Sequence, residues 1–205
     1  MTGHIHLFAK TARSGAVKTR LEPALGRHGA LAVYRELLNG TIELLKASAY
    51  AKSTTVWHSP QRFQRALPSR LQARGTIGQR MAHAFAHADL PALAIGTDCP
   101  ALNASHLHLA FAALESHDVV FGPAHDGGYY LIGLNSRQPR LFQGIAWSTS
   151  TVLRQSLRRA QSLGLRVALL APLCDIDTPA DWSHACNQAH SPPLSGACPV
   201  SLSNR

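Results

Sequence analysis

Three features that would assign a protein class at once are missing from this 205-residue sequence. No apolar run approaches the roughly 20 residues that a membrane-spanning helix needs. The first residues, Met1 to Ile5, lack the basic and apolar regions of a secretory signal, so we expect a cytoplasmic protein without a membrane span. The four cysteines include no Cys-x-x-Cys pair, which favours free thiols over a structural zinc site.

Several enzyme signatures are missing as well. The sequence contains no Walker loop, no dinucleotide fingerprint and no Gly-x-Ser-x-Gly elbow. Cys99 has no identifiable histidine partner, which argues against nucleophilic catalysis. His83 and His87 are spaced to share one face of a helix, but the sequence offers no obvious third metal ligand. We therefore expect these two histidines to be ordinary helix residues.

Acidic residues are few, 11 against 20 Lys and Arg, and the resulting charge of +9 is unevenly distributed. Residues 1–80 contain 13 basic and 3 acidic residues, whereas residues 81–205 contain 7 basic and 8 acidic residues. This asymmetry suits an anionic ligand that also requires carboxylates, such as a metal-bound nucleotide. Nucleic acid is the alternative, but the basic residues are scattered singly and lack the aromatic pattern of an RNA-binding sheet.

Apolar periodicity predicts strands that alternate with helices. The predicted strands cover residues 5–9, 54–57, 92–96, 119–121, 129–134 and 165–170. The predicted helices cover residues 24–49, 77–88, 105–116 and 150–163, with Ser105 as one N-cap and Thr178 as the N-cap of a last helix; residues 60–77 are ambiguous. This alternation predicts one α/β domain over residues 1–189 with a mostly parallel sheet covered on both faces. Residues 190–205 are expected to form a disordered tail.

Acidic residues follow three of the predicted strands. Asp98 follows one strand, Asp126 another, and Asp175 and Asp177 a third. In open α/β sheets, ligands bind outside the carboxyl ends of the strands. A hard divalent cation would relieve the repulsion among carboxylates gathered there and would bind phosphate oxygens. The alternative is that each aspartate only caps the helix that follows it.

The basic counterpart is the segment from Lys10 to Leu21, directly after the first strand. Gly15 would let backbone amides approach a phosphate, while Lys and Arg side chains neutralise its charge. A solvated basic loop is the simpler alternative. For Asp126-Gly127-Gly128-Tyr129, close ligand approach and a plain hairpin turn explain the glycines equally well. Trp147-Ser148-Thr149, before a predicted helix, is also compatible with an ordinary cap.

Six motifs occur together in one order: Lys18-Thr19-Arg20-Leu21, Gly78-Gln79-Arg80-Met81, Gly96-Thr97-Asp98-Cys99-Pro100, the segment from Gly122 to Leu134, Trp147-Ser148-Thr149, and the segment from Asp175 to Asp181. They resemble a bacterial family of uncharacterised domains often labelled arsenosugar-biosynthesis glycosyltransferases, over residues 4 to 187. The resemblance implies a three-layer α/β/α sandwich, the GT-A-like fold of the nucleotide-diphospho-sugar transferases. That family is also similar to phospholactate guanylyltransferases and molybdenum-cofactor nucleotidylyltransferases.

The resemblance also implies roles for single residues. Asp98 would bind a metal, with Asp177 as a second ligand, and Lys18 and Arg20 would bind nucleotide phosphates. Asp126, Gly127 and Gly128 would line the substrate side. The full set of expected site residues is Asp98, Lys18 and Asp126 for catalysis, Lys10, Gly15, Lys18, Thr19, Arg20, Arg80 and Thr97 for phosphate, Gly127, Gly128, Tyr129 and Trp147 for substrate, and Asp98 and Asp177 for the metal. The chain departs from the family pattern in having no proline shortly after Lys10, and Gln79 where the family often has Glu.

We therefore expect a transferase that depends on Mg²⁺ or Mn²⁺ and acts on a nucleotide-activated donor and a small-molecule acceptor. Glycosyl transfer from a nucleotide-diphospho-sugar is the preferred reaction, as the family label suggests. Nucleotidylyl transfer from a nucleoside triphosphate to a phosphorylated acceptor is the alternative, because a triphosphate needs the neutralisation that the basic segment supplies. A non-catalytic nucleotide-binding module would not need the three aspartates together. The base, the sugar, the acceptor and the oligomeric state do not follow from the sequence.

Overall fold

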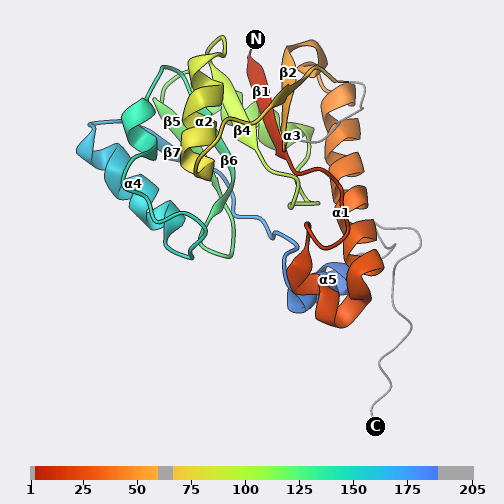
Figure 1. Cartoon of the computed structure of the whole chain (residues 1–205). Coiled ribbons are helices and arrows are strands. Elements are labelled where there is room, and N and C mark those ends of the chain that lie inside the picture. The colour runs from red at the N-terminus through yellow and green to blue at the C-terminus, as the bar shows by residue number, and fades with distance from the viewer. Residues whose placement is uncertain (1–2, 60–66, 189–205) are drawn as a thin grey trace.

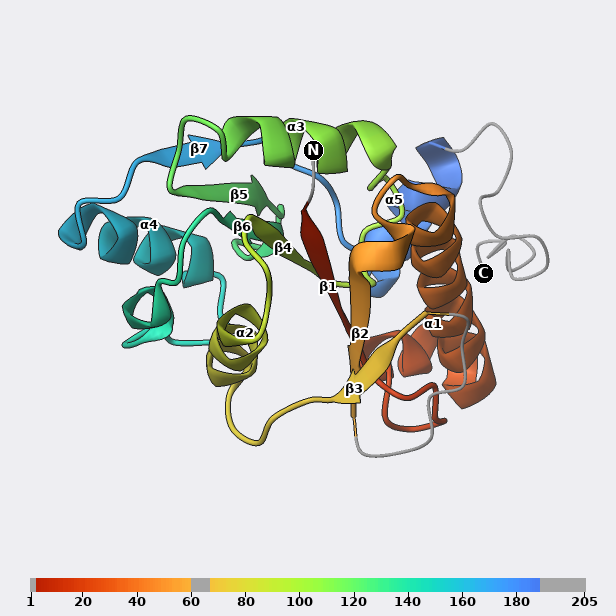
Figure 2. The ribbon, with the colours of Figure 1, turned by 90° about the horizontal axis from the view of Figure 1, so that it is seen from above.

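A sheet with helices on both faces forms the frame of the molecule (Figures 1 and 2). The computed structural model describes residues 3–59 and 67–188. The sheet formed by these residues has seven strands: β1 His4–Ala9, β2 Thr54–His58, β3 Ser69–Leu71, β4 Ala92–Ile95, β5 Val119–Pro123, β6 Tyr129–Leu134 and β7 Val167–Leu169. Their order across the sheet is β3-β2-β1-β4-β6-β5-β7.

Most neighbouring strands are parallel, as the sequence predicts. The exception is β6, which runs antiparallel to both β4 and β5. Only a tight turn joins β5 to β6, and a connection this short allows antiparallel pairing but no parallel crossover. β3 lies in the segment that periodicity left ambiguous; all three of its residues are exposed at the sheet edge, so burial imposes no alternating pattern on them.

Helices cover the two faces of the sheet in separate layers. The helices are α1 Glu22–Ala47, α2 Ile77–Ala86, α3 Ala104–Ala113, α4 Val152–Ser162 and α5 Pro179–Gln188, with short 3-10 turns at Thr19–Leu21, Ala51–Ser53 and Pro139–Phe142. The side chains of Ile5 and Leu7 pack with α1 and α3, whereas Phe8, on the opposite side of β1, packs with α2. This alternation along one strand produces the three-layer α/β/α sandwich and confirms the expected fold class.

One predicted helix cap is wrong. The third helix begins at Ala104, and its N-cap is Asn103 rather than Ser105. Asn103 has the extended backbone that a cap requires, and its side chain accepts hydrogen bonds from the amides of Ser105 and His106. The first helix is kinked near its start, where Gly26 has a non-helical backbone with a φ of 67°.

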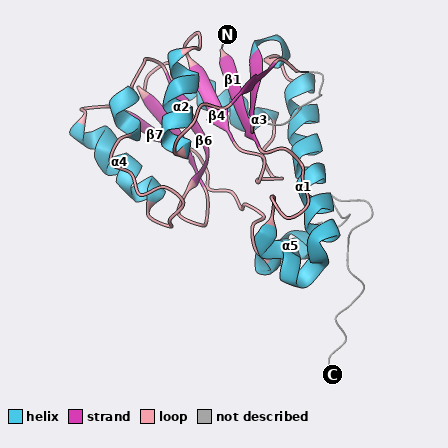
Figure 3. Cartoon of the chain, in the orientation of Figure 1, coloured by secondary structure: helices cyan, strands magenta, loops and turns pink. Residues whose placement is uncertain are grey.

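The last helix closes the fold beside the first. A small core that contains Leu21, Val33, Ile176 and Trp182 joins α5 to the start of α1. The loop between β7 and α5, drawn in pink in Figure 3, therefore passes the carboxyl ends of the central strands before it reaches α5. Among the described helices, none is both long and apolar enough to cross a membrane. The predicted tail at 190–205 lies outside the described residues, and the domain boundary at 189 stays a prediction.

Candidate active site at the carboxyl ends of the strands

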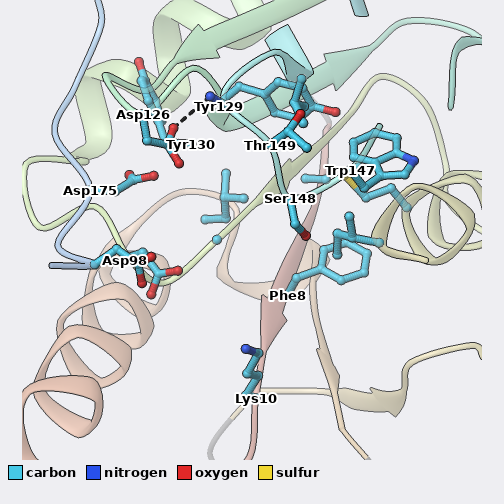
Figure 4. A pocket seen from close by; sticks show the side chains of 18 of the residues that line it. Phe8, Lys10, Asp98, Asp126, Tyr129, Tyr130, Trp147, Ser148, Thr149 and Asp175 are labelled. Atoms are coloured by element: carbon cyan, nitrogen blue, oxygen red, sulfur yellow. Dashed lines mark hydrogen bonds between the residues drawn. The ribbon is translucent and has the colours of Figure 1, made fainter. Parts of the chain in front are cut away.

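A cavity of about 700 Å³ opens where β1 and β4 end. Its charged lining side chains are Lys10, Lys18, Arg20, Asp98, Asp126, Asp175 and Asp177. The carboxylates come from three loops, which follow β4, join β5 to β6, and join β7 to α5. Figure 4 shows Asp98, Asp126 and Asp175 directed toward the same part of the cavity. The sheet thus gathers the three acidic segments that the sequence places at strand ends.

Lys18 ties two of these loops together. Its ammonium group lies 2.7 Å from Oδ1 of Asp98 and 3.6 Å from Oδ1 of Asp177, and it donates a hydrogen bond to the carbonyl of Ile176. The Lys18 side chain is only 3% exposed. A buried ammonium group needs such partners, because its charge has lost most of its hydration. Lys18 is therefore a buried part of the cavity wall, and these carboxylates compensate its charge.

The Asp98 carboxylate is held by one of its two oxygens. Oδ1 accepts from Lys18 and from the hydroxyl of buried Thr97, at 3.3 Å, and the backbone carbonyl of Asp98 accepts from the amide of Ile176. The other oxygen, Oδ2, has no partner among the described residues. Asp177, by contrast, uses both oxygens, because Arg20 lies 2.7 Å from Oδ2. Of the two expected metal ligands, Asp98 is therefore the more available.

Asp175 is the least compensated charge in the cavity. Its Oδ1 is buried without a hydrogen-bond partner in the described structure. Burial, and then the nearby charges of Asp98 and Asp126, raise the pKa of Asp175 to about 7. Both effects disfavour the ionised form, and the charge of a bound cation would oppose them.

The residues of this cavity fit a divalent cation by their chemistry. Four carboxylates line it against three cationic side chains, so a diphosphate entering alone would meet a surplus of negative charge. The unpartnered oxygens of Asp98 and Asp175 are the hard ligands that Mg²⁺ and Mn²⁺ prefer. In the described part of the chain, however, no group of three His, Cys, Asp or Glu side chains is already arranged as a metal site. A nucleotide would have to supply the remaining ligands.

The basic segment after β1 forms one wall of the cavity. The hydroxyl of Tyr34 bridges the amide and the carbonyl of Lys10, at 2.7 Å each, and so fixes the start of the segment. Lys18 has a φ of 49°, in the left-handed region that a residue with a side chain seldom adopts. Lys10, Lys18, Thr19 and Arg20 line the cavity, whereas Gly15 only supplies a turn with a φ of 74°. The role expected for Gly15 has no support in this geometry.

Arg80, like Gly15 and Thr97, is an expected phosphate ligand that does not line the cavity. Its guanidinium group donates to the carbonyl of Gly75 and to the side chain of Gln72, at 3.0 and 2.9 Å. Gln72 in turn donates to the carbonyls of Ala9 and Trp57, at the ends of β1 and β2. Arg80 therefore braces the strand ends, and phosphate binding by Arg80 stays an unsupported prediction.

The glycine pair after Asp126 serves two purposes. The amide of Gly128 donates to Oδ1 of Asp126, at 2.8 Å, which shapes the turn. Gly127 has a φ of 88°, and a Cβ there would lie 2.0 Å from the carbonyl oxygen of Ser150. Gly128 and Tyr129 line the cavity, but Gly127 does not. Gly127 thus allows close packing of two loops rather than lining the substrate side itself.

Trp147 lies in the cavity wall, and its contact with a substrate stays a prediction. Its neighbour Ser148 and the β1 residue Phe8 also line the cavity, and sequence reasoning missed both (Figure 4). Phe8 gave no signal because an aromatic residue in a predicted buried strand is expected to belong to the core. Ser148 was hidden by the simpler interpretation as a cap, yet α4 begins only at Val152.

The isolated candidates of other chemistry do not form sites. Cys99 is buried, and burial, followed by the charge of Asp175, raises its pKa to about 12, which argues against a thiolate nucleophile. His83 on α2 and His87, the C-cap of that helix, are exposed neighbours with ring centroids 4.3 Å apart. Among the described residues they belong to no metal-binding group.

Solved structures show the class to which this fold belongs. A protein from Desulfovibrio desulfuricans G20, provisionally named a nucleotide-diphospho-sugar transferase, is 27% identical, with a TM-score of 0.81 over 92% of this chain and 89% of that chain. A cytidylyltransferase from Leptospira borgpetersenii serovar Hardjo-bovis (strain JB197) is 13% identical, with a TM-score of 0.62 over 94% and 90%. Rv0371c from Mycobacterium tuberculosis H37Rv, in complex with manganese, is 11% identical, with a TM-score of 0.57 over 92% and 100%. The chain has the fold of nucleotide-diphospho-sugar transferases and nucleotidyltransferases.

The family follows from the sequence itself. The profile of a family described as uncharacterised proteins conserved in bacteria (DUF2064) matches residues 36–149, more than half of the chain. The chain belongs to this family, which agrees with the resemblance that its motifs indicate. No curated protein matches the chain.

Proposed function

We propose that this protein is a divalent-cation-dependent transferase that uses a nucleotide-diphospho-sugar and transfers its glycosyl group to a small-molecule acceptor. The observation that carries the proposal is the cavity in which a basic segment faces four carboxylates at the carboxyl ends of the strands. The transferase names of the structural relatives support an enzyme of this class. The relative in complex with manganese supports the dependence on a cation.

Asp98 is the proposed anchor of the cation. Asp175 is better placed than Asp177 to be the second ligand, because its Oδ1 is free of partners while both oxygens of Asp177 pair with Lys18 and Arg20. When bound, Mg²⁺ or Mn²⁺ would neutralise the charge that develops on a departing diphosphate.

The side chains of the chain itself bind and orient the donor. Lys10 is exposed and lines the cavity, and it would pair with a phosphate oxygen together with the exposed end of Arg20. Lys18 holds Asp98 in place through Oδ1 and leaves Oδ2 for the ligand. Asp126 keeps its second oxygen free, because only Oδ1 accepts from Gly128, and this oxygen would accept a proton from an acceptor hydroxyl.

Nucleotidylyl transfer is the second candidate, and the cytidylyltransferase relative favours it. That reaction brings a phosphorylated acceptor next to a nucleoside triphosphate. It therefore needs cationic side chains for the acceptor phosphate as well as for the triphosphate. Among the described residues, the cationic side chains that line the cavity all come from residues 10–20, and two of the three are already paired with aspartates. This shortage of free positive charge favours an uncharged acceptor and hence glycosyl transfer.

A product assay separates the candidates. The protein is incubated with panels of nucleotide-sugars and nucleoside triphosphates, each with Mn²⁺ or with a chelator, and with mixed sugars and sugar phosphates as acceptors. Release of a nucleoside diphosphate from a nucleotide-sugar, lost on chelation, is the expected result. Release of pyrophosphate from a triphosphate would select nucleotidylyl transfer instead. Activity that survives chelation would refute the dependence on a cation.

A further inference from the structure

The cavity has two parts of different chemistry (Figure 4). The carboxylates of Asp98, Asp126 and Asp175 gather on one side, and Lys10 stands apart from them. Phe8 and Trp147 lie on another side, where they belong to one apolar cluster with Ile77 and Met81. All four residues line the cavity and form its uncharged part. A ligand that fills the whole cavity must therefore combine an anionic group with an uncharged group that has an apolar surface.

Residues 147–150 form a strap across the uncharged part, and both of its ends are fixed by glycines. A Cβ on Gly78 of α2 would lie 2.3 Å from indole carbon atoms of Trp147. At the other end, the carbonyl of Ser150 packs against Gly127. The amide of Leu153 donates to the carbonyl of Gly127 at 2.9 Å and adds a backbone link. Packing and a backbone hydrogen bond therefore fix the position of the strap in the cavity wall.

Ser148, in the middle of the strap, has an unfavourable backbone conformation. Its φ is 63°, and within the described residues only Lys18 shares a positive φ without being glycine. Both residues line the same cavity. A serine in the left-handed region costs about 1 kcal/mol or more, which a glycine would avoid. Strain of this kind concentrates at functional sites, where the side chain itself is needed.

The hydroxyl groups of the strap differ in their partners. Thr149 donates to the carbonyl of Ala146 at 2.8 Å and also contacts the hydroxyl of Thr151, so its oxygen serves the fold. The hydroxyl of Ser148 has no hydrogen-bond partner among the described residues, and it points into the cavity on the side of Phe8 (Figure 4). The strained backbone thus presents one free hydroxyl group to whatever occupies the uncharged part.

We propose that Ser148 is a positioning residue whose hydroxyl group hydrogen-bonds a hydroxyl of an uncharged sugar ring, which lies beside Trp147 in the uncharged part of the cavity. The inference rests on the proposed function and names the group that the site must orient. A sugar ring combines apolar C–H faces, which pack on an indole, with hydroxyl groups that need partners. The ring belongs either to the nucleotide-sugar or to the acceptor.

Two variants of one residue test the proposal. Ser148→Ala removes the hydroxyl and keeps the strain, whereas Ser148→Gly removes both. Calorimetry in Mn²⁺ measures the binding of UDP, GDP, CDP and ADP, of their glucose conjugates as donors, and of glucose as an uncharged acceptor to the nucleotide-bound protein. We expect both variants to bind the bare diphosphate with the affinity of the wild type. One of the two sugar ligands, the nucleotide-sugar or the acceptor sugar, should bind about five-fold more weakly, because one neutral hydrogen bond is lost. The melting temperature of Ser148→Gly should equal or exceed that of the wild type.

The sugar ligand that loses affinity identifies the source of the ring. Unchanged affinity of Ser148→Ala for both sugar ligands would overturn the proposal. So would an equal loss with the bare diphosphate, because the contact would then lie on the nucleotide. A loss of affinity that goes with a lower melting temperature in Ser148→Gly would indicate a structural role and would overturn the proposal as well. Wild-type protein that binds none of the diphosphates in Mn²⁺ would refute the proposed function itself.

Discussion

Replacement of Lys18 by methionine tests whether this buried ammonium group is the counter-charge of the two carboxylates that it contacts. Methionine keeps most of the side-chain volume and removes the charge. Breaking a buried ion pair costs about 3–5 kcal/mol when the remaining charge stays buried. Here the partners Asp98 and Asp177 are 47% and 43% exposed, so water can rehydrate them after the change. We therefore expect a smaller loss of about 2–3 kcal/mol in the free energy of unfolding, mainly from the two lost charge-assisted hydrogen bonds.

Arg20→Met is the matched control. Arg20 contacts the same Asp177 at 2.7 Å, but its side chain is 71% exposed, so its removal should cost less than about 1 kcal/mol. Urea unfolding at pH 7.5 in the presence of a chelator measures both variants. For a chain of this size, the Lys18 variant should melt roughly 5–10 °C below the wild type.

Addition of Mn²⁺ gives the second measurement. Without Lys18, Asp98 and Asp177 repel each other and Asp175 more strongly, so a cation should stabilise Lys18→Met more than it stabilises the wild type. Equal destabilisation by the two variants would refute the reasoning about burial. An equal gain from Mn²⁺ in wild type and variant would show that the cation does not bind among these carboxylates.

Three further predictions address the site, the core and the turn. Asp98→Asn should weaken the binding of Mn²⁺ and of Mn²⁺–nucleotide in calorimetry at least ten-fold, while Asp89→Asn, an exposed change at the opposite end of β4, should not; equal affinities would remove Asp98 from the site. Burial lowers the pKa of His6 to about 3. Between about pH 6.5 and pH 3 the imidazole is therefore protonated in the unfolded chain but not in the folded protein, and the free energy of unfolding falls as the pH falls. His6→Gln should therefore remove about 2–3 kcal/mol of the stability difference between pH 7.5 and pH 4.5 in urea unfolding, and an unchanged acid slope would contradict the buried neutral state. Gly127→Ala should cost at least about 2 kcal/mol, because its Cβ would strike the carbonyl of Ser150 at a φ of 88°; wild-type thermal stability would show that the turn has another conformation.

Much of the architecture follows from local sequence patterns. Each buried position of a strand or helix requires an apolar residue, so burial leaves a strand or helix pattern in the sequence. For this reason β1, β4, β6 and the core helices lie close to where the patterns predict them. The position of Asp98 at a strand end needs no tertiary knowledge either. Edge strand β3 and the cap at Asn103 could not be found in this way, because the first has no buried face and the second depends on backbone conformation rather than residue type alone.

Contacts between distant segments decide the rest. The sequence by itself determined the α/β alternation, the three acidic strand ends and the basic segment after β1. Only the tertiary structure decided that Lys18 lies buried against Asp98 and Asp177, that Arg80 braces strand ends, and that Ser148 faces the cavity. The physical reason is that burial and hydrogen-bond partners depend on which loops the sheet brings together. The pairing of Lys18 with the carbonyl of Ile176 spans 158 residues, a distance over which no local pattern carries information.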